Sequence, residues 1–172
     1  MTKFQLASVA ASALMAASLA GCAPPAAKSS VDTGKIADTV KADVAQNVAD
    51  FNAHDAAKVA SHDAPDVVQI FHGTANETGA AADQAASVKF FADNPTTHFS
   101  VADGSVDVSA SGDLAIYRSS YAMTVTDPKT KKDVTETGNY IAAYKPQTDG
   151  SWKLAWSVGS DTPAPAPAAA KN

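Results

Sequence analysis

The chain has 172 residues, with 13 basic and 18 acidic side chains, a net charge of −5 and one cysteine, Cys22. A single cysteine excludes an intramolecular disulfide and any zinc site built on several thiolates. Arg118 is the only arginine, and together with the negative net charge this argues against nucleic acid as a partner. The length provides for one domain.

Residues 1–21 predict a lipoprotein signal peptide. Lys3 precedes an uncharged run from Leu6 to Leu19, which is shorter than the roughly 20 residues that span a bilayer. The run ends in Leu19-Ala20-Gly21-Cys22, which resembles the lipobox of bacterial lipoproteins. The resemblance implies cleavage before Cys22 and its lipidation. Because Ala23 and not aspartate follows, it also implies the outer membrane, facing the periplasm. A generic secretory signal with an incidental Cys22 is the alternative.

Composition divides the rest of the chain into a stalk, a domain and a tail. Residues 22–31 are rich in Pro, Ala and Ser and predict a flexible stalk. Residues 161–172 are rich in Pro and Ala and predict an extended, disordered tail. The folded domain is therefore expected over residues 32–160.

The domain is expected to begin with two helices. Apolar residues spaced by three and four from Ile36 to Phe51 predict an amphipathic helix, capped by Asp32 or Thr33. A short second helix is expected over residues 56–61.

A strand and a third helix follow. Ala64-Pro65-Asp66 is expected to interrupt the chain before the β-branched and aromatic run 67–72, which predicts a strand closed by Gly73. Residues 80–93 have helical composition, and Asn94-Pro95 ends that helix.

From Thr97 onward the pattern predicts an antiparallel meander of four strands. Turn signals lie at residues 111–113, 128–133 and 146–150. The inward-facing apolar residues change from odd positions (Phe99 and Val101) to even positions (Val106 and Val108). This change predicts a bulge near residues 102–104 that bends the sheet.

Aromatic residues four apart recur on three of these strands, so each pair shares a face. A four-residue and a five-residue loop would align them across the sheet in two rows. The predicted rows are Tyr117, Tyr144, Trp152 and Tyr121, Tyr140, Trp156. Such residues either fill the core or orient an apolar ligand in a pocket.

Four short strings resemble the SnoaL-like or ketosteroid-isomerase-like superfamily, which has the nuclear-transport-factor-2-like or cystatin-like cone. They are Ala64-Pro65-Asp66, Ser111-Gly112-Asp113-Leu114-Ala115, Gly138-Asn139-Tyr140 and Asp149-Gly150-Ser151-Trp152-Lys153-Leu154. The resemblance covers residues 35–161. It implies an α+β fold in which a curved, cone-shaped antiparallel sheet wraps around the N-terminal helices.

The resemblance does not carry a reaction with it. Ketosteroid isomerase uses an aspartate base, which in that family lies at the end of the first strand, whereas Ile70-Phe71-His72-Gly73 has no carboxylate. Asp66 is interpreted as a capping or turn residue. His72 remains the candidate for acid–base catalysis because its ordinary pKa suits that role.

The expected ligand-binding residues are Phe71, His72, Tyr117, Tyr121, Tyr140 and Trp156. His54, His62 and His98 lack metal-ligand spacing, and neither a metal nor a cofactor is expected.

The first hypothesis is therefore a lipid-anchored envelope protein whose domain binds a small apolar or amphipathic molecule, without assigned catalysis. One alternative is an isomerase, dehydratase or cyclase that uses His72 with a pocket tyrosine. Another is a dimeric protein-interaction module. A homodimer through the outer sheet face is expected, because that face mixes aliphatic residues such as Ile116 and Ile141 with small ones.

Overall fold

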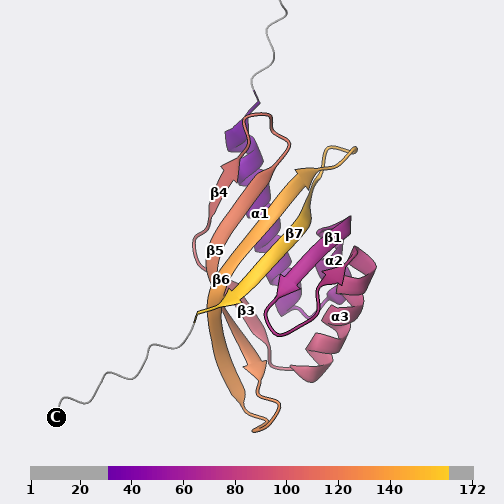
Figure 1. Cartoon of the computed structure of the whole chain (residues 1–172), viewed down its shortest axis with the longest axis vertical. Helices are drawn as coiled ribbons and strands as arrows, with labels where there is room; N and C mark the ends of the chain where they lie inside the picture. The colour runs from indigo at the N-terminus through magenta and orange to yellow at the C-terminus, as the bar shows by residue number, and fades with distance from the viewer. Residues whose placement is uncertain (1–30, 163–172) are drawn as a thin grey trace, which may run out of the picture. The chain divides into compact units, whose positions relative to one another are not determined.

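A computed structural model describes residues 31–162, which form three helices and seven strands (Figure 1). The helices are α1 (Thr33–Asn52), α2 (Ala56–Ser61) and α3 (Ala80–Asp93). The strands are β1 (Asp63–Phe71), β2 (Glu77–Thr78), β3 (His98–Val101), β4 (Ser105–Val108), β5 (Ala115–Thr126), β6 (Asp133–Pro146) and β7 (Trp152–Asp161). The predictions for the signal peptide, for Cys22 and for most of the stalk and tail lie outside the described residues.

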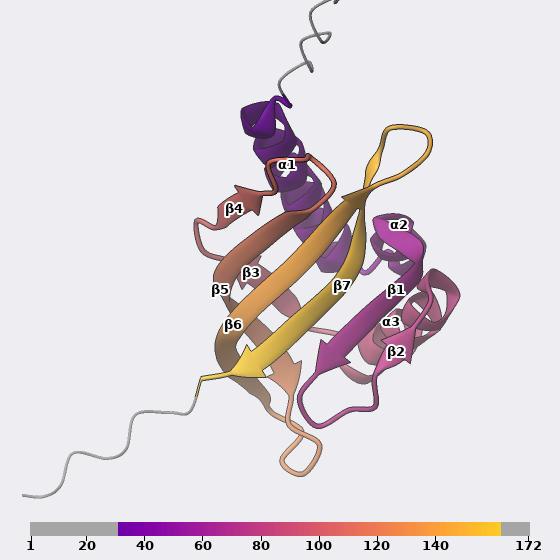
Figure 2. The same cartoon turned by 45° about the horizontal axis from the view of Figure 1, so that its top comes forward.

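The strands form one sheet in the order β2-β1-β7-β6-β5-β3, and β4 also pairs with β5. The helices lie on one side of this sheet (Figure 2). The predicted α+β architecture, a curved sheet around N-terminal helices, is confirmed. The sheet is mixed and not wholly antiparallel, because β1 runs parallel to β7 while the other pairs are antiparallel.

The helices follow the periodicity of the sequence closely. Asp32 caps α1 by accepting a hydrogen bond from the backbone N–H of Lys35 at 2.9 Å. Val40 and Val44, one turn apart, are buried on the face of α1 that meets the sheet. The bounds of α2 and α3 agree with the predicted ranges.

The first strand begins earlier than expected. Residues 64–66 lie inside β1, so the predicted interruption is wrong. Proline is tolerated there because the pairing of β1 with β7 shifts register between Asp63 and Val68, which leaves Pro65 outside the regular ladder.

The predicted register of the aromatic rows is also wrong, by two residues in the β5–β6 hairpin and, in the β6–β7 hairpin, by two residues at Tyr144 and by three at Tyr140, which opposes Gly159. The β5–β6 loop has six residues, 127–132, so Tyr121 opposes Gly138 and Tyr140 opposes Ser119. A shift of two residues leaves every side chain on its predicted face. The four tyrosines of β5 and β6 therefore still point to the same, helix-covered face.

Two bulges decide which other side chains reach that face. The predicted slip near residues 102–104 is confirmed, because Val101 opposes Tyr121 whereas Val106 opposes Tyr117. A second bulge was not predicted. Ala155 has no partner on β6, and this extra residue turns Trp156 to the outer face.

The core lies between α1 and the end of the sheet that carries the β6–β7 turn. Its largest fully buried side chains are Tyr144, Leu154, Val40 and Val67. None of the helices within residues 31–162 has the length and apolar character needed to cross a membrane. At the other end of the sheet the same layers enclose a pocket.

Candidate functional site

The pocket has a volume of about 440 Å³, opens to solvent, and is lined by residues of the three helices and of the inner face of the sheet. Its walls are mainly aromatic and aliphatic. The principal apolar side chains are Phe51 of α1, Val59 of α2, Phe90 of α3, Phe99 of β3, Met123 and Val125 of β5 and Leu154 of β7. Volume and lining are typical of a small-molecule site.

Phe51 organises the aromatic wall. Its ring centroid lies 5.9 Å from that of Phe90 and 5.5 Å from that of Phe99. Phe99 continues the cluster to Tyr121 at 5.7 Å. Asn52 anchors this arrangement, because its side-chain amide exchanges two 2.8 Å hydrogen bonds with the backbone of Phe99.

Four of the six predicted ligand-binding residues line the pocket: Phe71, His72, Tyr121 and Tyr140. Tyr117 does not, because it is buried among core residues, with only 3% of its surface exposed, and donates a long hydrogen bond to the carbonyl of Ala102. Trp156 does not, because the bulge at Ala155 turns it to the opposite face.

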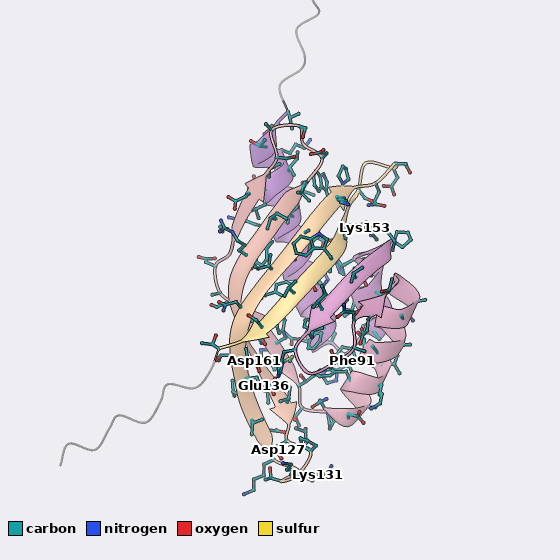
Figure 3. The ribbon with its side chains drawn as sticks, viewed as in Figure 1. Phe91, Asp127, Lys131, Glu136, Lys153 and Asp161 are labelled. Carbon is teal, nitrogen blue, oxygen red and sulfur yellow. The ribbon has the colours of Figure 1, made fainter. Side chains whose placement is uncertain are left out.

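His72, Asp161 and Tyr121 meet at the mouth of the pocket. His72 Nε2 lies 2.9 Å from Asp161 Oδ2, and the Tyr121 hydroxyl donates to Asp161 Oδ1 at 3.3 Å. Burial and the nearby Asp161 carboxylate raise the pKa of Tyr121. Figure 3 labels Asp161 at this end of the sheet, close to Glu136, which also lines the pocket.

Parallel pairing explains why a carboxylate lies beside His72. β1 and β7 run side by side, with Phe71 opposite Gly159, so both strands end at the same edge of the sheet. His72 follows the end of β1 and Asp161 ends β7. Sequence reasoning found no acid for His72, because the two residues are far apart in the chain and nothing local predicts this pairing.

A pair of buried carboxyl groups joins β1 to α3 beside the pocket. Asp63 begins β1 and Asp83 lies in the first turn of α3. Only 7% and 6% of their surfaces are exposed. The two carboxyl groups are coupled to each other, and neither Oδ2 atom has a hydrogen-bond partner among residues 31–162.

This pair retains a proton at neutral pH. Burial, followed by the charge and hydrogen bond of Asp83, raises the pKa of Asp63 to about 8. Burial also raises the pKa of Asp83, although its interactions with Asp63 and Gln69 act in the opposite direction. We therefore place the proton on Asp63 and the negative charge on Asp83, the member that lines the pocket.

Only the comparison with solved structures places this geometry among known proteins. Neither a protein-family model nor a curated protein matches the sequence. Among solved structures, a ketosteroid isomerase-like protein from Erwinia carotovora superimposes with a TM-score of 0.62, at 19% identity, over 74% of this chain and 96% of its own. An NTF2-like superfamily protein from Salmonella enterica gives 0.67 at 10% identity, over 81% and 99%.

The chain has the NTF2-like fold. A suggested dehydratase of the NTF2-like family from Streptomyces avermitilis agrees, with a TM-score of 0.64 at 16% identity over 78% of this chain and 100% of its own. At such identities the likeness establishes the NTF2-like fold alone, and function has to be argued from the site.

A second buried network lies outside the pocket and joins α1 to the end of α2. His62 Nδ1 donates to Asp43 Oδ1 at 2.8 Å, and Nε2 donates to Asp50 Oδ2 at 3.1 Å. Both ring nitrogens donate only in the imidazolium form. The hydrogen bond to Asp43 is the main cause that raises the pKa of His62, and the bond from His62 lowers the pKa of Asp50.

Sequence reasoning missed both buried acid groups. One signal was present, because Asp43 and Asp50 are seven residues apart and therefore share a helix face. No local signal joins Asp63 to Asp83. Within the described residues no three histidine, cysteine or acidic side chains gather as metal ligands.

Proposed function

We propose that this protein is a lipid-anchored envelope protein that binds a small apolar or amphipathic molecule in the pocket of its NTF2-like domain. The observation that carries the proposal is the 440 Å³ pocket with aromatic walls. Natural ligand sites span roughly 300–1,000 Å³ and are lined mostly by apolar groups, with a few polar ones that set orientation.

The energetics of such a pocket favour an apolar body. A ligand that buries roughly 200 Å² of apolar surface gains about 5 kcal/mol from transfer out of water. Polar atoms of His72, Tyr121 and Tyr140 are available at the pocket to orient it. Burial raises the pKa of Tyr140 far above its ordinary value, so this hydroxyl stays protonated and can act as a hydrogen-bond donor.

The anchor is the second part of the proposal. Cys22 follows a short apolar segment and precedes a Pro- and Ala-rich stretch. An acylated Cys22 would hold the protein at a membrane, because each buried methylene adds about 0.8 kcal/mol. The described domain begins only about ten residues later, so the pocket would remain near the membrane surface.

A neutral fluorescent probe, N-phenyl-1-naphthylamine, tests the binding proposal. Ala86 lines the pocket from α3, whereas its neighbour Ala85 is exposed and does not. Ala86→Phe should fill the pocket and weaken probe binding at least tenfold, whereas Ala85→Phe, the matched control, should bind like the wild type. Absence of saturable binding by the wild type, or equal binding by Ala86→Phe, would refute a ligand pocket at this position.

The contact between His72 and Asp161 supports an enzyme as a second candidate. A carboxylate on Nε2 favours the tautomer that carries its proton there, which leaves Nδ1 as the base. This arrangement suits proton abstraction next to a carbonyl, the step that isomerases and some dehydratases share. The suggested dehydratase with the same fold is consistent with this candidate.

Proton exchange distinguishes the enzyme from the binder. The wild type should accelerate deuterium exchange at the carbon next to the carbonyl of 2-tetralone, measured by NMR. His72→Ala should lose this acceleration by roughly 100-fold or more, a typical contribution of a general base. His98→Ala, an exposed histidine that does not line the pocket, is the control. Equal exchange in both variants would exclude the role of His72.

A further inference from the structure

The pocket combines apolar walls with an unbalanced negative charge. Its lining includes the carboxyl groups of Glu77, Asp83 and Glu136 but neither lysine nor arginine, as far as residues 31–162 are concerned. His72 is the histidine of the lining, and it lies at the exposed mouth with Asp161 as its partner. The acidic groups of the lining therefore have no lysine or arginine of the lining to neutralise them.

Asp83 is the acid that needs a cation most. It is 94% buried and lines the pocket, and although Asp63 and Gln69 interact with its carboxyl group, its Oδ2 atom has no hydrogen-bond partner in the described part of the chain. A buried carboxylate loses its hydration and is stabilised only by pairing or hydrogen bonding. Asp83 also lies at the N-terminus of α3, but the partial charge of a helix end is small compared with a full cation.

Glu77 adds a second negative group beside the first. It is half-buried on β2, and burial together with the charge of Asp83 raises its pKa. The buried His62 is not free to pair with these acids, because both of its ring nitrogens are already bonded to Asp43 and Asp50. A cation that satisfied Glu77 and Asp83 would have to come from the ligand.

The surrounding walls favour an organic cation over a hydrated metal ion. Phe51, Phe90 and Phe99 present aromatic rings to the same pocket. Ring faces attract ammonium groups and also bury the hydrocarbon attached to them. The donors that a metal ion needs are not assembled here, because no three acidic or histidine ligands converge in the described residues.

We propose that the pocket takes an apolar amine, a hydrophobic body with one protonated nitrogen, and that Asp83 and Glu77 are its counter-ions. This inference rests on the proposed function, because it names the class of molecule that the pocket would bind. The nitrogen lies at the carboxylates of α3 and β2, and the apolar body lies against the Phe51, Phe90 and Phe99 rings. Anionic molecules are rejected by the same charges.

Three naphthalene probes of nearly equal size test the charge preference at pH 7 by isothermal titration calorimetry on the purified protein. They are 1-naphthylmethylamine, which is cationic, 1-naphthalenemethanol, which is neutral, and 1-naphthoate, which is anionic. The amine should bind at least tenfold more tightly than the alcohol, and the carboxylate more weakly than the alcohol.

Variants locate the cation within the pocket. Asp83→Asn and Glu77→Gln should each weaken binding of the amine at least fivefold and leave the alcohol unchanged. Asp93→Asn makes the same change at an exposed position of the same helix and should alter neither affinity. If Asp83→Asn does not fold, Glu77→Gln decides the question, because that side chain is only half-buried.

The outcomes separate this inference from the proposed function. If the alcohol binds as tightly as the amine, or if the variants weaken both probes equally, the amine preference is wrong while a ligand pocket remains. If none of the three probes binds saturably, both proposals fail.

Discussion

The buried carboxyl pair makes the stability of this protein depend on pH in a direction that can be tested. The pKa of Asp63 rises from its ordinary value of 3.8 to about 8 in the folded protein. Above pH 4 the unfolded chain loses this proton, whereas the folded protein keeps it up to about pH 8. As the pH rises, the unfolded state therefore becomes more favourable relative to the folded state, and the free energy of unfolding decreases between about pH 4 and pH 8.

The size of the effect follows from proton linkage. One retained proton lowers the free energy of unfolding by about 1.4 kcal/mol for each pH unit. Between pH 5 and pH 8 the loss should approach ~4 kcal/mol, a large part of the 5–15 kcal/mol that is typical of a domain. Asp63→Asn cannot ionise, so its unfolding free energy relative to the wild type should increase by a similar amount over this range.

Urea unfolding at pH 5, 6, 7 and 8 measures this, with the fluorescence of Trp152 and Trp156 as the signal. Asp66→Asn, an exposed position on the same strand, should keep the wild-type pH profile. His62 acts in the same direction but in a different window. Its pKa is raised from 6.5, so its stabilisation is complete below that pH and is lost as the pH rises through the folded pKa.

The pH dependence is most informative below about pH 6, where His62 is largely protonated in both the folded and the unfolded state. A wild-type protein whose stability does not fall between pH 5 and 6.5 would refute the protonated pair. So would an Asp63→Asn variant that retains the full wild-type slope. His62→Gln should alter the profile mainly above about pH 6. If the slope changed only in that variant, the pH dependence would belong to His62 and not to Asp63.

Three further predictions concern packing, anchoring and assembly. Gly138→Ala should lower the unfolding free energy by about 2 kcal/mol, because the new Cβ would lie 2.1 Å from the backbone oxygen of Ser160. Gly34→Ala, at an exposed position of α1, is the control and should not destabilise the protein. Equal urea midpoints for the two variants would contradict this prediction. Cys22→Ser should remove acyl labelling by a clickable palmitate analogue and move the protein from the membrane to the soluble fraction, and persistent labelling would rule out Cys22 as the anchor. Ile141 is 37% exposed on the outer face of β6, so Ile141→Lys should convert the proposed homodimer to a monomer in light scattering, and a wild type that is monomeric at all concentrations would exclude the homodimer.

Some features of the candidate site were predictable from residue types alone. Phe71 and His72 end a β-branched strand, and Tyr121 and Tyr140 lie at positions of equal parity on long strands. Parity survives a register error of two residues, which is why Tyr121 and Tyr140 were predicted on the correct face although their predicted pairing was wrong. Trp156 was misplaced because one unpaired residue, Ala155, reverses parity.

The acids of the site could not be predicted in the same way. Asp63 and Asp83 lie on different elements and meet only because α3 packs against β1. Asp161 reaches His72 only because β7 lies parallel to β1 in the sheet. Each of these contacts joins residues that are distant in sequence, and no spacing rule connects them.

By itself the sequence determined the helices and the faces of most strands. These depend on periodicity, capping and turns, which act over a few residues. Only the tertiary structure decided the mixed sheet, the bulge at Ala155 and the buried proton shared by Asp63 and Asp83. The reason is physical: desolvation and charge coupling arise when distant segments exclude water together, and a local pattern carries no record of which segments will do so.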